Sequence, residues 1–513
     1  MQINEKIVIL DFGSQYTQVI ARKVRELGVY AEIFPYNISL EEFQKLAPKG
    51  LILSGGPSSV FADEAPHPSF NVFEQNIPVL GVCYGLQLIA YQCGGAVDKA
   101  AKREFGRAEL IVDTEDELLN GMKSNSIVWM SHGDSLTKMP GGFEAIAHTI
   151  NAPICAIRNL DKKIWGVQFH PEVHHSEEGL KVLENFVRKI CHCTDTWTTH
   201  AFIETQIQKI KEMVGDDEVI CALSGGVDST VLAVLLHKAI GDQLKCIHID
   251  TGLMRLNESS KLMKLFEDNF NMHIELIDGS ETFLSSLEGV DDPEQKRKII
   301  GKSFIDLFEV ASKKFNNAKW LAQGTLYPDV IESVSVKGPS VVIKSHHNVG
   351  GLPEKIGFKL LEPFRELFKD EVRAVGQELG VPEWFVKRHP FPGPGLGIRV
   401  LGNISKDKVK TLQLADAIYI EEIRNAGLYD DIWQAFAVLL PVKSVGVMGD
   451  ERTYENTCAL RAVTSVDGMT ADWYQMPYEL LAKISSRIIN EVRGINRVVY
   501  DITSKPPGTI EWE

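Results

Sequence analysis

Short apolar runs alternate with segments of helical periodicity over the first hundred residues of the chain. The runs, at residues 6–11, 29–34, 50–53 and 78–82, have the length and apolar character of buried strands. After the first run, apolar residues recur at helical spacing at Val19, Ile20, Val24 and Leu27. Alternation of this kind predicts a parallel sheet covered by helices.

The pattern changes beyond residue 96. Shorter strands with turns follow, for example at 127–131 and 164–169, and an amphipathic helix is expected at 179–189. The polar stretch 191–199 ends this region. A helix at 201–213 then leads into a second alternation, with a strand at 219–223, a helix at 229–239 and a strand at 245–250.

The three prolines at 390–394 exclude regular structure, so this segment is either a linker or a mobile lid. The tail beyond it mixes a helix at 406–426 with β-rich runs such as 444–448 and 497–502. We therefore expect an α/β protein with domains at residues 1–193, 194–388 and 389–513. The last of these should be a smaller α+β domain.

Composition narrows the function classes. The 513 residues carry a net charge of −15, which argues against a surface that binds nucleic acid non-specifically. The eight cysteines lack the spacing of a disulfide framework, and the first residues lack a signal-peptide layout. No apolar run approaches the roughly 18–20 residues that span a bilayer. We expect a cytoplasmic protein that binds neither nucleic acid nor membrane.

A cysteine flanked by glycines follows the fourth run, in Gly81-Val82-Cys83-Tyr84-Gly85. A sharp strand-to-helix turn exposes such a nucleophile, and side chains at the two glycine positions would collide with the turn. The helix that follows points its N-terminus at the sulfur and favours the thiolate. By itself the spacing suits a structural cysteine equally well.

His170 and Glu172 change that balance. They follow the run at 164–169, and residues two apart in an extended segment share a face. Glu172 can then orient an imidazole that takes the Cys83 proton and later protonates leaving ammonia.

The turn at 54–57, Ser-Gly-Gly-Pro, supplies small residues where a backbone N–H must approach an oxyanion. We expect the Gly56 and Tyr84 amides to form that oxyanion hole. With the segments 50–57, 81–87 and 166–172 in this order, residues 5–190 strongly resemble the class I glutamine amidotransferase family. The resemblance implies a flavodoxin-like domain that hydrolyses glutamine to glutamate and ammonia through a thioester.

Two nearby clusters were weighed as metal sites. His174 and His175 have no accompanying cysteine or carboxylate constellation, so a polar loop is the better interpretation. Cys191-His192-Cys193 lacks a fourth ligand nearby, and we interpret it as part of a linker.

A second glycine-rich turn, Ser224-Gly225-Gly226-Val227-Asp228-Ser229, follows the strand at 219–223. It lacks the ending of a Walker loop, so transfer of the γ-phosphate is not indicated. Its N–H groups can converge on an anion, and Asp228 suits Mg²⁺ bound to phosphates. The turn resembles the pyrophosphate loop of N-type ATP pyrophosphatases, which implies a Rossmann-like domain whose loop residues bind ATP. The family cleaves ATP between the α- and β-phosphates and adenylates an acceptor.

Two more segments are candidate walls of the nucleotide pocket. Asp250 ends a strand expected beside the first one, where adenosine binds in such folds. An adenosine contact and a turn or helix N-cap role are equally compatible with this aspartate. The segment 321–325 repeats the theme of a strand entering small residues, and we expect Gly324 to contact ATP.

The tail at 505–513, Lys-Pro-Pro-Gly-Thr-Ile-Glu-Trp-Glu, indicates the acceptor. Its lysine suits a phosphate, and its carboxylates suit ring N–H groups or ribose hydroxyls. With the segments 292–301, 344–353 and 388–396, it makes the whole chain resemble the glutamine-hydrolysing GMP synthetase family.

That resemblance implies a ligase with XMP as acceptor, GMP as product, and a homodimer formed by the C-terminal domain. It also implies XMP contacts from Arg297, Gln434, Lys505 and Glu511. Arg297 lies in a charge run that would otherwise be a solvated helix face. A lid at 390–395 would bring Lys387 and Arg388 to the phosphates when closed.

Other function classes remain as alternatives. A glutamine-fed NAD synthetase or a tRNA-modifying pyrophosphatase shares the ATP chemistry, but the tail and the acidic balance oppose both. A purine-nucleotide sensor with decayed active sites would not need to keep Cys83, His170, Glu172 and Asp228.

Overall fold

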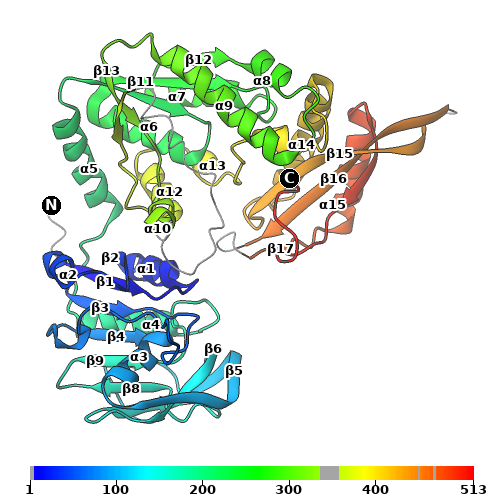
Figure 1. Cartoon of the computed structure of the whole chain (residues 1–513). Coiled ribbons are helices and arrows are strands. Elements are labelled where there is room, and N and C mark those ends of the chain that lie inside the picture. Colours follow the sequence, from blue (N-terminus) through cyan, green and yellow to red (C-terminus); the bar gives the residue numbers. More distant parts are fainter. Residues whose placement is uncertain (1–4, 335–356, 449–450, 466–469) are drawn as a thin grey trace. The chain divides into compact units, whose positions relative to one another are not determined.

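The computed structural model describes residues 5–334, 357–448, 451–465 and 470–513, and within them the chain forms two compact units (Figure 1). The first unit contains the described residues up to Thr205 and the helix that begins at Tyr327; the second contains the other described residues. The motif segment 344–353 lies outside the described residues. No helix in the described ranges combines the length and apolar character that crossing a membrane requires.

Within its described residues, the first unit is built on a nine-stranded sheet. Strands β2, β1, β3, β4 and β9 are parallel to one another. Strands β8, β7, β5 and β6 continue the sheet with antiparallel pairing. Across the sheet they are β2 (Tyr30–Pro35), β1 (Lys6–Asp11), β3 (Gly50–Leu53), β4 (Val79–Val82), β9 (Ile164–Val167), β8 (Ala156–Asn159), β7 (Glu144–His148), β5 (Ala96–Val112) and β6 (Ser126–Lys138). The predicted parallel sheet is thus confirmed.

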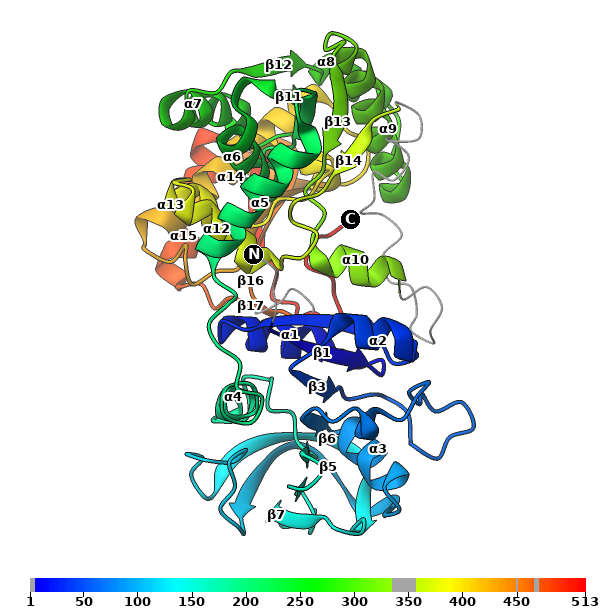
Figure 2. The same ribbon diagram turned by 90° about the vertical axis from the view of Figure 1, so that its left-hand side faces the viewer.

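Helices cover this sheet, and Figure 2 shows α3 and α4 on opposite sides of it. The helical elements are α1 (Thr17–Glu26), α2 (Leu40–Leu46), η1 (Val72–Glu74), α3 (Tyr84–Gln92), α4 (Gly179–Glu184), α5 (Thr199–Val214), which leads into the second unit, and α10 (Tyr327–Val334). The helix predicted at 179–189 is α4 continued by a π-helical turn, η2 (Asn185–Ile190). In that turn the Cys191 N–H reaches the Phe186 carbonyl at 2.8 Å.

The second unit contains a parallel sheet of five strands among its described residues. Their order is β12 (Ile274–Asp278), β11 (Leu244–Asp250), β10 (Glu218–Leu223), β13 (Ala318–Ala322) and β14 (Lys359–Leu361). The helical elements around it are α6 (Val227–Ile240), η3 (Gly241–Gln243), α7 (Glu258–Phe270), α8 (Ser280–Ser286), α9 (Pro293–Ser312), α12 (Lys369–Glu378) and α13 (Glu383–Val386).

A separate, mainly antiparallel sheet follows in the same unit. Its strands are β15 (Gln434–Met448), β16 (Glu451–Thr464), β17 (Asp472–Trp473) and β18 (Ile495–Tyr500), and the last pairs parallel with β16. The helical elements of this region are η5 (Gly395–Ile398), α14 (Lys406–Asn425) and α15 (Tyr478–Glu491). The predicted α+β character of the tail is confirmed.

One hydrophobic core joins the two sheets of the second unit. Ile249 and Ile300, from the parallel-sheet part, belong to the same buried cluster as Leu396, Val400 and Leu439. The segment 388–392 is neither helix nor strand, as its prolines predict, but the chain from Leu396 onward enters this core. Beyond residue 395 the chain is therefore part of the core and is not a linker. A lid at 390–395 stays a prediction.

A fully buried arginine, Arg461 on β16, holds the C-terminal tail against the last sheet. Its guanidinium donates to Asp501 Oδ2 at 2.8 Å and to the carbonyls of Thr503, Thr509 and Ile510 at 2.8–3.0 Å. A buried charge is tolerated when it is paired and hydrogen-bonded, and Arg461 meets both conditions.

Replacing Arg461 with Met should destabilise the second unit. The substitution removes the arginine donor of three carbonyls and the cation paired with Asp501, which keeps its bonds from Trp512 and Thr503. Breaking a buried ion pair costs about 3–5 kcal/mol. Thermal and urea unfolding would measure the loss. Arg452→Met, at an exposed arginine of the same strand, should stay within about 0.5 kcal/mol of the parent protein. Equal stability of the two variants would contradict the tail-anchoring role.

Candidate active sites

Cys83 lies at the sharp turn between β4 and α3, with φ 52° and ψ −102°. A non-glycine residue at positive φ is strained and persists where the surroundings fix it. An ideal Cβ on Gly81 would lie 2.5 Å from the Gly85 carbonyl carbon, and one on Gly85 would lie 2.4 Å from the Leu53 oxygen. The predicted steric need for both glycines is confirmed.

His170 and Glu172 lie together beside that turn. The His170 Nδ1 and Glu172 Oε1 atoms are 2.7 Å apart, and both side chains are buried. Burial disfavours the imidazolium, but the Glu172 carboxylate and the Cys83 sulfur outweigh it and raise the pKa of His170 well above its usual value. The arrangement can hold a protonated imidazole next to a sulfur nucleophile.

Gln168 was missed by sequence reasoning, although it also borders the nucleophile. Its Nε2 lies 3.7 Å from Cys83 Sγ, and on another side the sulfur lies 3.8 Å from the Ser131 carbonyl oxygen. Gln168 is fully buried in an otherwise apolar segment. A polar residue in such a run was the available signal, because buried polar groups need partners.

The turn at Gly55 and Gly56 lies against the same site. A Cβ on Gly56 would approach the Phe12 oxygen to 2.7 Å and Tyr84 Cγ to 3.4 Å. A Cβ on Gly55 would lie 3.1 Å from His170 Cε1. Tyr84 begins α3, so its backbone N–H has no intrahelical acceptor. The two predicted oxyanion donors are therefore neighbours, and their role stays a prediction.

The two clusters weighed as metal sites have other surroundings. The rings of His174 and His175 lie 3.8 Å apart, and His175 also stacks on Trp129 at 4.4 Å. Cys191 and Cys193 are both buried after η2. In the described part of the chain, no group of three or more histidine, cysteine or acidic side chains is arranged to hold a metal ion.

The second predicted loop joins β10 to α6. Gly225 has φ +80°, a conformation that favours glycine, and Gly226 is the N-cap of α6. The Ser224 hydroxyl accepts the Gly226 N–H at 3.3 Å and lies 3.1 Å from the Ser229 hydroxyl. The helix N-terminus after this turn suits an anion, as predicted from the small residues.

Asp228, in the first turn of α6, has an incomplete set of partners. Its buried Oδ1 has no hydrogen-bond partner among the described residues, and its Oδ2 lies 3.5 Å from Lys369 Nζ. A Cβ on Gly324 would lie 3.9 Å from Asp228, so this second predicted wall is adjacent. An unpartnered carboxylate oxygen fits a Mg²⁺ ligand, because Mg²⁺ prefers oxygen and shares it with substrate phosphates.

Asp250 makes the turn that was one of its two interpretations. Its Oδ1 accepts the Gly252 N–H at 2.9 Å, and its carbonyl accepts the Gly279 N–H at 2.8 Å. Both bonds shape the end of β11. Contact with adenosine stays a prediction.

All four predicted XMP contacts lie in the tail 505–513 or contact it. Gln434 Nε2 donates to Glu511 Oε1 at 2.7 Å, and Arg297 donates to the Glu513 carbonyl. Lys505 pairs through its backbone with Ala471, at 2.7 and 3.1 Å, at the start of the tail. The structure therefore brings Gln434 and Glu511 into direct contact. Arg297 contacts the tail two residues later, at Glu513.

Two cations at this cluster were not among the predicted site residues. Arg399, fully buried, donates to both Glu511 oxygens at 2.8 and 3.0 Å and stacks on Phe436 at 4.1 Å. Lys296, also fully buried, donates to Glu513 Oε2 at 2.6 Å. Arg399 stands in an apolar run at 396–401, a signal that its charge is buried and paired.

Curated relatives match the whole chain. It is 57% identical to the glutamine-hydrolyzing GMP synthase of Brachyspira hyodysenteriae, with all of both chains covered, and 58% identical to that of Fusobacterium nucleatum, with 99% of both covered. The chain belongs to the glutamine-hydrolysing GMP synthase family. This confirms the resemblance found in the sequence.

Three domain families match successive parts of the chain. The class-I glutamine amidotransferase family matches residues 8–190, the NAD synthase family 198–300, and the GMP synthase C terminal domain 421–512. Among solved structures, a glutamine amidotransferase from Thermotoga maritima covers 37% of this chain and 99% of its own, with 16% identity and a TM-score of 0.31. The domain limits predicted at 193 and 388 stay predictions.

Glu172→Gln should lower the pKa of His170, because the variant removes the carboxylate that opposes desolvation. A raised folded-state pKa stabilises the fold below the ordinary histidine pKa, and this contribution is lost as pH rises through the raised pKa. The stability difference between parent and variant should therefore shrink at high pH. NMR titration of the His170 ring, with pH-dependent unfolding, would measure both effects.

The matched control is Asp113→Asn, which removes the carboxylate 2.8 Å from the half-buried ring of His148. It should leave the titration of His170 in place. An unchanged His170 titration in the folded Glu172→Gln protein would show that the carboxylate does not set the charge of this ring.

Proposed function

We propose that this chain makes GMP from XMP, with ammonia released from glutamine at Cys83 and with ATP consumed at the loop 224–229. The observation that carries the proposal is the coexistence of two intact centres on one chain. Cys83 lies with His170 and Glu172, and Asp228 lies with an anion-binding turn. Full-length relatives named GMP synthase support the choice of product.

At the first centre, Cys83 Sγ attacks the carboxamide carbon of glutamine. The amides of Gly56 and Tyr84 donate to the oxyanion. His170, oriented by Glu172, gives its proton to leaving ammonia and then activates the water that hydrolyses the thioester.

At the second centre, the backbone N–H groups of 224–229 hold the ATP phosphates, with Gly324 and Asp250 as further nucleotide contacts. Asp228 is the protein ligand that fits Mg²⁺, which would neutralise charge on the phosphates. Arg297, Gln434, Lys505 and Glu511 hold XMP so that its oxygen attacks the α-phosphate and pyrophosphate leaves. Ammonia then displaces AMP at purine C2.

NAD synthesis is the alternative with the most support, because the NAD synthase family matches residues 198–300. That match covers the ATP-binding part alone. The region that recognises the acceptor, 421–512, matches the GMP synthase C terminal domain, and its tail carries Glu511. XMP is therefore the favoured acceptor.

The C-terminal sheet supports the proposed homodimer. In the long β15–β16 hairpin of Figure 1, Val445 pairs with Tyr454, and these two side chains are 54% and 61% exposed. Val447 on the same strand is 73% exposed. Exposed apolar residues gathered on one hairpin are typical of an interface. The eight cysteines, all free, fit the proposed cytoplasmic location.

Cys83→Ala should abolish glutamine-driven GMP formation and leave ammonia-driven formation within about twofold. The nucleophile belongs to the first unit and the ATP loop to the second, so ammonium supplied from solution bypasses the missing step. GMP, AMP and pyrophosphate would be measured with each nitrogen donor. The buried Cys155→Ala serves as control. A folded Cys83→Ala protein that ammonium cannot rescue would contradict the assignment of two separable centres.

Asp228→Asn should have the opposite phenotype. The amide weakens the hold on Mg²⁺ and the phosphates, so AMP formation should fall about 100-fold or more with either nitrogen donor. Glutamine hydrolysis at Cys83 need not fall with it. Asp242→Asn, beyond the far end of α6, is the control. A near-normal rate of AMP formation would remove Asp228 from the mechanism.

A further inference from the structure

The part of the second unit that carries the ATP loop is bridged to strand β15 by one arginine. Arg255 lies between β11 and α7, and its Nη2 donates to the Ala435 carbonyl at 2.9 Å. Its Nε lies 3.1 Å from Asp416 Oδ2, on α14, as an ion pair without the geometry of a hydrogen bond. A guanidinium has the fork geometry to hold both acceptors at once, which a lysine does not.

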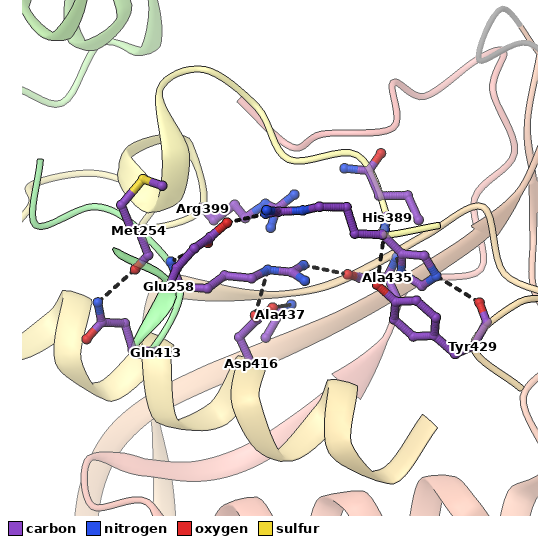
Figure 3. Close-up of polar contacts among 12 residues, drawn as sticks. Met254, Glu258, His389, Arg399, Gln413, Asp416, Tyr429, Ala435 and Ala437 are labelled. Atoms are coloured by element: carbon purple, nitrogen blue, oxygen red, sulfur yellow. Dashed lines mark hydrogen bonds and ion pairs between the residues drawn. The ribbon is translucent and has the colours of Figure 1, made fainter. Parts of the chain in front are cut away.

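The N–H and carbonyl of Ala435 point away from β16, and side chains from other segments satisfy both groups. Its carbonyl accepts from Arg255, and its N–H donates to His389 Nδ1 at 3.2 Å. Two residues on, the Ala437 N–H donates to Asp416 Oδ1 at 3.0 Å. Figure 3 shows these contacts converging on the strand. The start of β15 is therefore fixed by groups from three other segments.

The same arrangement reaches the ATP loop. Glu258, at the start of α7, accepts the Arg255 backbone N–H at 3.2 Å and pairs with the Arg388 guanidinium. Arg388 also donates to the Gly225 carbonyl at 2.6 Å. The turn at Gly225 is thus tied through Arg388 and Glu258 to the residue that holds β15.

On the other side, β15 begins with Gln434, whose amide donates to Glu511. Any shift of Ala435 moves the neighbouring Gln434, a proposed XMP contact. The path from the ATP loop to the acceptor side is continuous and consists of charged or backbone groups with defined geometry.

We propose that Arg255 is a positioning residue that sets the register between the ATP loop and the acceptor-binding start of β15. Through Asp416 and the Ala435 carbonyl it holds Gln434 at the distance that in-line attack on the α-phosphate requires. Resting on the proposed function, this inference assigns a role to a residue that does not touch the reacting atoms. Misplacement by about 1 Å can slow such a reaction roughly 100-fold.

The test uses the full chain with ATP, XMP and ammonium, so that the glutamine site plays no part. Arg255→Met should lower kcat for AMP formation at least about 10-fold while KM for ATP and for XMP stays within about threefold. Arg255→Lys keeps a charge near Asp416 and cannot hold both acceptors, so its kcat should be intermediate. If the Arg255→Met protein does not fold, the kcat of Arg255→Lys tests the positioning role by itself.

Arg487→Met is the matched control. Arg487 bridges Glu421, Glu422 and Glu491 between α14 and α15, at 2.7–3.1 Å, without reaching β15. It should lower stability without changing kcat. If Arg255→Met lowers kcat no more than Arg487→Met at equal stability, or raises KM and leaves kcat unchanged, Arg255 has no positioning role.

A double-mutant cycle adds an independent measurement. Because Asp416 and Arg255 act on the same strand, Asp416→Asn should slow AMP formation in the parent protein and add less than twofold in the Arg255→Met background. If the two substitutions slow AMP formation multiplicatively, Arg255 and Asp416 do not share one role. The proposed function fails separately: it is wrong if the parent protein forms no AMP and pyrophosphate from ATP and XMP.

Discussion

Both candidate centres depend on the unusual backbone conformation needed where a parallel strand turns directly into a helix. At Gly81 and Gly85 a single added carbon would meet backbone at 2.4–2.5 Å, and the cysteine between them has a strained φ of 52°. At Gly225 the same kind of turn requires positive φ. Such a turn leaves backbone N–H groups at a helix start without acceptors. The conformation of each turn therefore supplies the N–H groups to which the proposed chemistry assigns anion binding.

This restriction on the backbone explains why much of the fold and of the two loops could be predicted from the sequence. Apolar runs, helical spacing and glycines are local signals, and they located β1, β3 and β10, and both turns, within a residue or two. The spacing of His170 and Glu172 is equally local. What could not be predicted depends on distant partners: Arg399 and Glu511 are 112 positions apart, and no periodicity connects them.

Arg399, which was not among the predicted site residues, and Arg461 owe their positions to one physical cause. Arg399 and Arg461 have fully buried side chains in apolar surroundings, and a charge there is stable when it has fixed partners. Both find those partners in the last residues of the chain, so the tail becomes part of the core. In the sequence, each arginine interrupts an apolar run. The direction of its guanidinium follows from packing that only the complete second unit provides.

The carboxylates separate into two classes by how many of their oxygens have partners. Glu511 and Asp416 use both oxygens, on Arg399 and Gln434 in the first case and on Arg255 and Ala437 in the second. Glu172 and Asp228 each keep a buried oxygen that no described residue satisfies. Leaving a buried acceptor unpaired is unfavourable, and natural structures tolerate it where function uses the group. Asp416 holds the scaffold and Glu511 fixes the proposed XMP contact Gln434, whereas the incompletely paired Glu172 and Asp228 lie at the two proposed reaction centres.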